Sequence, residues 1–189
     1  MEKYSRIKAL ISLDAIRYNF EQMKKNIKEG TKIIAVIKAD AYGHGAVPIA
    51  RMLEEFDYIW GFAAATAQEA LQLRKAGITR PILILGLVFE EYYKKLAEND
   101  VRMAVCDYET ARKFNKAAEA AGKKGLIHLA ADTGMTRIGF KDSEESLEEI
   151  RRIAALPNVE IEGLFTHFAR ADEYLSLIHI SEPTRRSYI

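Results

Sequence analysis

Short apolar runs of strand length alternate along the chain with longer segments in which apolar residues recur at helical spacing. Candidate strands begin at Ile33 (IIAVIK), Tyr58 (YIWGFAA), Ile82 (ILILG), Val101 (VRMAVC), Leu126 (LIHLAA) and Val159 (VEIEGLF). The predicted helices lie between them, over residues 47–56, 66–75, 90–98, 108–121 and 143–155. Because strands that are apolar on both faces and separated by helices are typical of parallel sheets, the pattern predicts an α/β fold.

The predicted helices also have the end signals that helices require. Thr66 and Ser143 stand where an N-cap hydroxyl would accept a hydrogen bond from a free amide group. Gly77 and Gly122 follow helical segments, as glycines that end helices do. The boundaries of at least four helix ends are therefore predicted by local chemistry.

The number and spacing of the strands favour a closed barrel over an open sheet. Successive strand starts are separated by 19 to 33 residues, so eight such units would need roughly the 250 residues of a (β/α)8 barrel. A doubly wound sheet could be complete with six strands, but no Gly-x-Gly-x-x-Gly turn follows the first strand. We therefore predict a partial (β/α)8 TIM-type barrel with about six of its eight βα units, in a chain that is cut short.

The last fifteen residues, 175–189 (LSLIHISEPTRRSYI), continue neither the helical nor the strand pattern. Their first part, LSLIHISEPTR, resembles the translation of a sequencing adapter. We therefore predict that residues 1–174 form an incomplete barrel domain and that residues 175–189 are a non-native tail. His179 and Ser181 are accordingly not site candidates, although a genuine amphiphilic tail is the alternative.

Composition and charge exclude several classes of partner. The 189 residues include 28 basic and 27 acidic ones, for a formal net charge of +1, and no basic block interleaves with aromatic residues. We therefore expect neither a nucleic-acid partner nor a membrane partner. A single cysteine, Cys106, allows no internal disulfide, and we expect it to be a buried small hydrophobe in a reducing compartment.

The sequence offers no targeting segment, metal motif or protease pair. The N-terminal residues lack the apolar core of a signal peptide, and no run reaches the ~18 apolar residues of a membrane span, so a cytoplasmic location is expected. No HExxH motif or clustered ligand spacing occurs, and no metal is predicted. Asp132-Thr133-Gly134 matches the aspartic protease triplet, but that chemistry needs two such aspartates and the chain has one.

Lys38 stands at the carboxyl end of the first predicted strand, which is where barrel enzymes place their chemistry. Beside Ile34, Val36 and Ile37 it should be partly desolvated, which lowers the pKa of a lysine and leaves a neutral amine able to form a Schiff base with a carbonyl. Tyr42 adds a phenol nearby. From these residues alone, a lysine that extends to solvent remains the alternative.

Five segments in order resemble the alanine racemase family. VIKADAYGHGA is similar to the family's lysine motif for pyridoxal 5'-phosphate (PLP), and SLDAIRYNF, PILILG, ADTGMTRIGF and EGLFTHFARADE resemble its opening helix and the segments at its middle, fifth and sixth strands. The resemblance runs from Ile7 to Tyr174. It implies a barrel domain that binds PLP.

The resemblance also implies roles for five residues. Lys38 would hold PLP covalently and act as the base on one face of the substrate α-carbon, and Tyr42 would contact the phosphate. Arg137 would approach the phenolic oxygen of the cofactor, His167 would lie against the pyridine ring, and Leu85 would line the pocket wall.

Taken without the family, two of these residues have other interpretations. An ion pair of Arg137 with Asp132 or Asp142 is an ordinary surface feature, and His167 could be a strand-end histidine with satisfied hydrogen bonds. One departure from the family bears on Arg137: many members carry a carbamylated lysine two residues before the DTG aspartate, and here that position is Ala130. A different neighbour or a bound anion would then support the arginine. His44 and His128 are left without a role.

The resemblance implies that the parent protein is a homodimer that interconverts L-alanine and D-alanine with two bases, for peptidoglycan precursors. Its second base would be a tyrosine of a C-terminal β-domain, supplied by the second subunit. The chain does not encode that region, so we expect this fragment alone to be inactive. A non-catalytic PLP-binding protein of cofactor homeostasis and a serine-type racemase are the alternatives.

Overall fold

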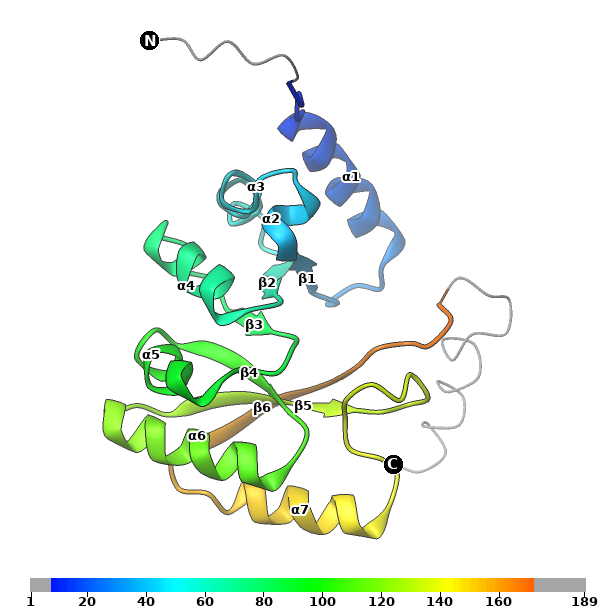
Figure 1. Cartoon of the computed structure of the whole chain (residues 1–189). Helices are drawn as coiled ribbons and strands as arrows, with labels where there is room; N and C mark the ends of the chain where they lie inside the picture. Colours follow the sequence, from blue (N-terminus) through cyan, green and yellow to red (C-terminus); the bar gives the residue numbers. More distant parts are fainter. Residues whose placement is uncertain (1–7, 172–189) are drawn as a thin grey trace. The chain divides into compact units, whose positions relative to one another are not determined.

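The computed structural model of the chain describes residues 8–171. The predicted non-native tail, residues 175–189, lies outside the described residues, as do Asp172 to Tyr174 of the predicted domain. The chain divides into two compact units, residues 1–82 and residues 83–189, and each is considered by itself (Figure 1).

The first unit contains a pair of parallel strands with helices. Its elements are α1 (Leu13–Asn26), β1 (Ile33–Val36), α2 (Lys38–Tyr42), α3 (Ala46–Leu53), β2 (Ile59–Ala64) and α4 (Ala67–Lys75), and β3 (Ile82–Ile84) begins at its last residue. In the β1–β2 pair, Ile34 lies opposite Gly61 and Val36 lies opposite Ala63. The core of the unit is built from fully buried side chains of α3, β2 and α4, among them Leu53, Ile59, Phe62 and Leu73.

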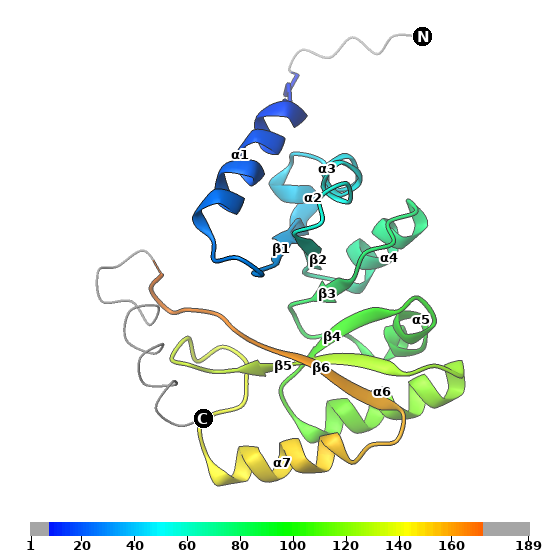
Figure 2. The same ribbon diagram turned by 180° about the vertical axis from the view of Figure 1, so that it is seen from behind.

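The second unit contains three parallel strands with helices on one face. Its elements are η1 (Glu90–Tyr92), α5 (Tyr93–Glu98), β4 (Val101–Val105), α6 (Tyr108–Ala121), β5 (Gly125–Ala131), α7 (Glu144–Ala154) and β6 (Val159–Thr166). Both views show α6 and α7 against the same face of β4, β5 and β6 (Figure 2). Close packing explains one glycine here, because a Cβ at Gly125 would lie 2.7 Å from the Phe114 ring.

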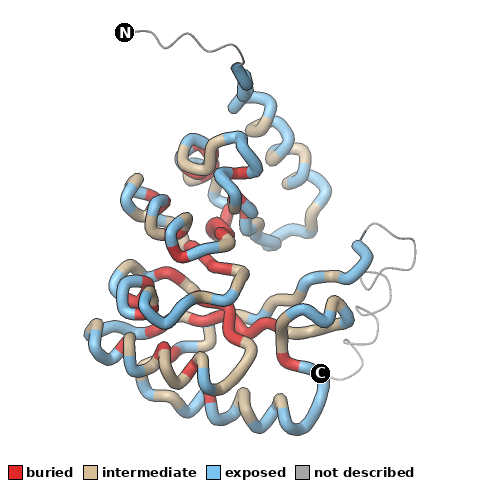
Figure 3. Tube along the Cα trace, in the orientation of Figure 1, coloured by how far each residue is buried: buried red, intermediate tan, exposed pale blue. Residues whose placement is uncertain are grey.

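Burial follows the strands of the second unit. The buried residues are concentrated in β4 and β5 and on the inner sides of the helices (Figure 3). Met103, Val105, Ile127 and Phe114 are fully buried. Leu164 of β6, in contrast, is 60% exposed. The apolar runs of the sequence thus correspond to the core in β4 and β5 but only partly in β6.

The strand order supports the predicted fold class. The strands follow one another in the order β1-β2-β3-β4-β5-β6, and the β1–β2, β4–β5 and β5–β6 pairs are parallel. A doubly wound sheet would place later strands on both sides of the first one, whereas a (β/α)8 barrel adds each new strand beside the last. The α/β fold of a partial barrel with six strands is therefore confirmed, and each strand begins within one residue of its predicted start.

The local end signals were also predicted correctly. The Thr66 and Ser143 side chains accept hydrogen bonds from the backbone amides of Glu69 and Ser146, at 3.3 and 3.2 Å. Gly122 ends α6 in the left-handed conformation, with φ of 63°.

The first strand ends at Val36, and Lys38 stands at its carboxyl end as the first residue of the turn that follows. One expectation was wrong. Cys106 is half-buried and not fully buried, because it lies one residue beyond the end of β4; burial still raises the pKa of its thiol.

Candidate functional site

Lys38 opens a left-handed turn and not an ordinary helix. The four residues after it, Ala39 to Tyr42, have φ values of 51°, 53°, 53° and 55°. None of them is a glycine, and the left-handed conformation costs other residues roughly 1–2 kcal/mol each. Contacts elsewhere in the first unit must therefore stabilise this turn.

The hydrogen bonds of the turn come from its own backbone and from two carboxylates. The Gly43 amide donates to the carbonyls of Ala39 and Asp40, at 3.1 Å each. The Asp40 carboxylate accepts a hydrogen bond from the Ala46 amide at 2.7 Å, and the Glu69 carboxylate accepts one from the Ala39 amide at 2.9 Å. The turn is thus closed at both ends by acidic side chains.

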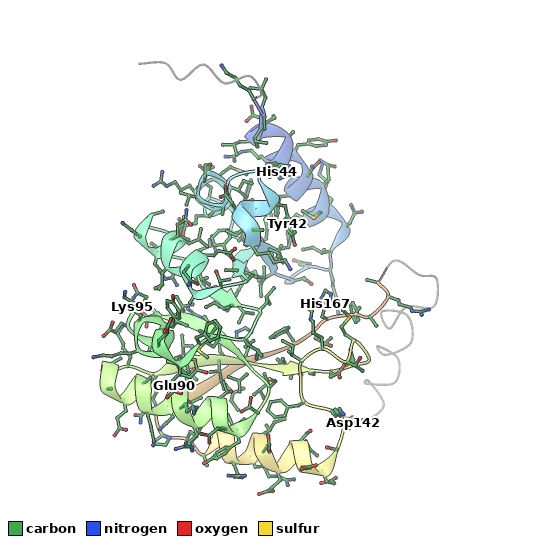
Figure 4. All side chains as sticks on the ribbon, viewed as in Figure 1. Tyr42, His44, Glu90, Lys95, Asp142 and His167 are labelled. Carbon is green, nitrogen blue, oxygen red and sulfur yellow. The ribbon has the colours of Figure 1, made fainter. Side chains whose placement is uncertain are left out.

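The side chains of this turn leave reactive groups available. Lys38 is half-buried and Tyr42 is 62% exposed. Neither the Lys38 amine nor the Tyr42 hydroxyl has a hydrogen bond or ion pair with any residue from 8 to 171. His44, labelled beside Tyr42 in Figure 4, differs, because its Nδ1 lies 2.9 Å from the carbonyl oxygen of Ala41. The first unit therefore provides a free amine and a free phenol.

Arg137 lies on a closed loop after β5. The loop begins and ends with backbone hydrogen bonds between Asp132 and Phe140 at 2.9 Å and between Phe140 and Ala130 at 2.8 Å. The Asp132 carboxylate accepts hydrogen bonds from the amides of Thr136 and Gly134, and these bonds lower its pKa. The aspartate of the protease-like triplet is therefore a structural residue of this loop.

The alternative interpretation of Arg137 as a surface ion pair is wrong. Arg137 is exposed, and no ion pair or hydrogen bond joins it to Asp132, Asp142 or any other described residue. Ala130, where many family members carry a lysine, is 2% exposed and lies opposite Phe165 in the β5–β6 pair. Its side chain contributes no charge near the arginine.

His167 follows the end of β6, and threonine hydroxyls connect this end to the Arg137 loop. Thr166 donates to the carbonyl of Ala131 at 2.8 Å, and the hydroxyls of Thr133 and Thr166 are 2.7 Å apart. Because Thr166 donates its one proton to Ala131, Thr133 is the donor between the two hydroxyls. Exposed His167, at the far end of β6 in Figure 4, has no hydrogen-bond or ion-pair partner within residues 8–171.

The five predicted site residues all follow the carboxyl ends of strands. Lys38 and Tyr42 lie together after β1 in the first unit. In the second unit, half-buried Leu85 follows β3, and the loop of Arg137 is hydrogen-bonded to the end of β6 beside His167. This is the strand end at which parallel barrels build active sites.

A polar network that no sequence motif indicated joins β4, β5 and β6. Arg102 binds the carboxylate of Glu162 through two nitrogens, at 2.9 and 2.8 Å, and Nε2 of His128 lies 2.9 Å from the same carboxylate. The Arg102 hydrogen bonds lower the pKa of Glu162. Because these residues are up to 60 positions apart, no local pattern could have joined them.

Glu162 reaches this network because of a bulge in β6. Ile127 lies opposite Ile161 but His128 lies opposite Gly163, which leaves Glu162 as the extra residue. Gly163 makes room for the histidine, since a Cβ there would lie 2.8 Å from the His128 ring. His128, for which the sequence indicated no role, is therefore a buried and hydrogen-bonded residue of the second unit.

The chemistry of the free side chains fits PLP. An amine suits its aldehyde, a guanidinium its phenolic oxygen, an imidazole its ring and a phenol its phosphate. Within residues 8–171 there is no group of three or more histidine, cysteine or acidic residues placed to hold a metal ion. Over the same residues, no helix is both long and apolar enough to cross a membrane.

Known proteins are similar to this chain over most of its length. The sequence profile of the family "Alanine racemase, N-terminal domain" matches residues 11–181. The chain is 43% identical over 164 residues to an alanine racemase of Methanococcus maripaludis, covering 87% of this chain and 44% of that protein. It is 44% identical over 165 residues to one of Clostridium tetani, covering 87% and 42%. The chain thus spans less than half the length of these curated relatives.

Solved structures of racemases also superimpose on this chain. An alanine racemase of Clostridium difficile 630 superimposes with a TM-score of 0.84 at 45% identity, covering 86% of this chain and 43% of that one. A histidine racemase of Leuconostoc mesenteroides superimposes with a TM-score of 0.79 at 31% identity, covering 87% and 44%. On the combined evidence of strand order, profile match and identity, this chain belongs to the alanine racemase family and corresponds to its N-terminal domain.

Proposed function

We propose that this chain is the PLP-binding part of an amino-acid racemase whose parent protein interconverts L-alanine and D-alanine. One observation carries the proposal: a half-buried lysine with no hydrogen-bond or ion-pair partner among residues 8–171 follows β1, in a chain 43% identical to an alanine racemase. When bound, PLP would supply an electron sink for negative charge at the substrate α-carbon.

Each of the five residues has a part in the proposed site. Lys38 would hold the cofactor covalently through its amine and, once the substrate has released that amine, would remove or return the α-proton on one face of the substrate. Tyr42 would donate a hydrogen bond to the phosphate, and Leu85 would line the pocket wall. The Arg137 guanidinium would bind the phenolic oxygen, and His167 would lie against the ring. The support for these roles is the family resemblance and the availability of the four polar side chains.

The proposal extends to the parent protein. Racemisation by two bases needs a second base on the opposite face of the substrate, which we assign to a tyrosine of the partner subunit in a homodimer. The chain as given should therefore bind PLP but not racemise alanine. We place the activity of the parent in the cytoplasm, in the supply of D-alanine for peptidoglycan; the family resemblance alone supports this part.

Covalent labelling tests the proposed role of Lys38. The purified chain is mixed with PLP, reduced with borohydride and digested, and the labelled peptide is identified by mass. We expect one cofactor per chain, on the peptide that contains Lys38, and no such label in Lys38→Ala. Lys75→Ala is the matched control, because Lys75 is an exposed lysine of the same unit at the end of α4. Equal labelling of Lys38→Ala and the unchanged chain would exclude the assignment.

The choice of substrate can be tested in the complete parent protein. The solved neighbour named a histidine racemase shows that substrates other than alanine occur among proteins of this fold. Once the downstream reading frame has been recovered from the source DNA, the complete protein can be supplied with L-alanine, L-serine and L-histidine in turn. We expect alanine to react fastest. Cofactor binding without racemisation of any of them would favour a cofactor carrier.

A further inference from the structure

The Glu69 carboxylate connects the segment after Lys38 to the end of β2. Its Oε1 accepts the Ala39 amide at 2.9 Å, and its Oε2 accepts the Ala65 amide at 2.8 Å. Ala39 is the residue directly after Lys38, and Ala65 is the first residue after β2. Both oxygens of one side chain are therefore used to join the carboxyl ends of two neighbouring strands.

This arrangement is more than a helix cap. Glu69 does form a capping box with Thr66 at the start of α4, but its contact with the Thr66 amide is long, at 3.4 Å. Its two shorter hydrogen bonds go to Ala39 and Ala65. Since hydrogen bonds to a charged acceptor strengthen as they shorten, the carboxylate is committed chiefly to the β1 and β2 ends.

The bond to Ala39 continues the pairing of β1 after the strand has ended. One residue after β1, the Ile37 amide still donates a hydrogen bond to the carbonyl of Ala63 at 2.9 Å. The next amide on the same side is that of Ala39, but the left-handed turn leads the chain away from β2. Glu69 supplies an acceptor at the point where β2 no longer can.

Lys38 is held between these two hydrogen bonds. The bond of Ile37 fixes the backbone before it and the bond of Ala39 fixes the backbone after it. The direction of a side chain depends on the φ and ψ angles of its own residue, so two fixed neighbours restrict where the amine can point. The four strained residues that follow would otherwise relax toward ordinary conformations.

We propose that Glu69 is a positioning residue for Lys38: its carboxylate, bonded to the Ala39 amide, fixes the left-handed turn and with it the direction of the lysine amine. The importance of this direction rests on the proposed function of Lys38. Both carboxylate oxygens of Glu69 accept backbone amides, so in this proposal Glu69 acts through the backbone.

The experiment compares variants that separate the positioning role from helix capping. Glu69→Ala removes the hydrogen bonds to the Ala39 and Ala65 amides. Glu69→Gln keeps one carbonyl oxygen, which can accept one of these two bonds. Thr66→Ala is the matched control, because it removes the cap bond of the same helix and leaves the acceptor of Ala39 in place. The first readout is amide hydrogen exchange of residues 38–46 and of α4 in the purified chain without PLP.

We expect amide exchange in residues 38–46 to become about tenfold faster in Glu69→Ala. The increase should be smaller in Glu69→Gln, and in Thr66→Ala the exchange rate should change by less than about twofold. Exchange in α4 should increase in both alanine variants. Equal protection of residues 38–46 in Glu69→Ala and Thr66→Ala would overturn the proposal, and so would full protection in Glu69→Ala.

The second readout is the rate of PLP labelling at Lys38. This rate should be about tenfold lower in Glu69→Ala than in the unchanged chain, intermediate in Glu69→Gln, and unchanged in Thr66→Ala. An unchanged rate in Glu69→Ala would overturn the positioning role even if the turn loosens. If the unchanged chain takes up no PLP at Lys38, the proposed function fails, while hydrogen exchange still decides whether Glu69 fixes the turn.

Discussion

Removing the charge of Glu162 should destabilise the second unit measurably, because Arg102 loses the carboxylate that accepts hydrogen bonds from two of its nitrogens. The side chains of Arg102 and Glu162 are 12% and 26% exposed, and two hydrogen bonds join them. Breaking a fully buried ion pair costs about 3–5 kcal/mol, whereas an exposed pair contributes about 0–1 kcal/mol. For a pair that is mostly but not fully buried, we expect Glu162→Gln to cost about 2 kcal/mol.

Native-state hydrogen exchange of β4 and β5 measures this cost in the second unit alone. A loss of about 2 kcal/mol corresponds to exchange about 30-fold faster when local opening limits exchange. Arg102→Met and the double variant complete a mutant cycle. The double variant should lose less free energy of unfolding than the sum of the single variants, with a coupling energy of about 1.5 kcal/mol, because the two side chains interact directly in the unchanged chain.

The Arg151–Glu148 pair of α7 is the matched control. Its side chains are 68% and 64% exposed at an N···O distance of 3.2 Å, so the cycle of Arg151→Met and Glu148→Gln should give a coupling below about 0.5 kcal/mol. A coupling between Arg102 and Glu162 no larger than that of the control would refute the argument from burial.

Two further predictions concern the same network. Gly163→Ala places a Cβ 2.8 Å from the His128 ring and should destabilise the unit by about 1–3 kcal/mol in thermal unfolding. His128→Ala should remove most of this penalty, and an equal penalty with or without the ring would contradict the proposed clash. Because Arg102 lowers the pKa of Glu162 from its ordinary 4.5, the stabilisation is complete above that value and is lost as pH falls through the folded pKa. When unfolding is measured from pH 6 downward, the free energy of unfolding should fall less in Glu162→Gln than in the unchanged chain.

The parts of the fold that depend on local chemistry could be predicted from the sequence. Apolar runs gave the six strand starts, and Thr66, Ser143 and Gly122 marked helix ends because caps depend on residues only a few positions apart. The strand count and spacing favoured a barrel, and the sequential strand order agrees.

The parts that depend on distant pairs could not be predicted. Ala39 and Glu69 are 30 positions apart, and Arg102 and Glu162 are 60 apart. The T-x-x-E pattern of Thr66 and Glu69 signals a capping box, but not that the carboxylate also reaches another strand. The segment ADAY gives no local reason for a left-handed turn either, because none of its residues favours positive φ as glycine does. Contacts across the unit decide its conformation.

Residue 130 is an alanine and not the lysine of many family members, so another group must hold Arg137 in place. The backbone of its loop is fixed without any lysine, by the Phe140 hydrogen bonds, the Asp132 carboxylate and the Thr133–Thr166 contact. The guanidinium itself has no hydrogen-bond or ion-pair partner within residues 8–171, and the buried side chain of Ala130 offers none. A fixed loop with an unpaired cation is suited to receive a negative charge from outside the chain, because no internal ion pair must first be broken. In the proposed site, the phenolic oxygen of the cofactor would provide that charge, so Arg137 would be ordered by the ligand and not by a neighbouring side chain.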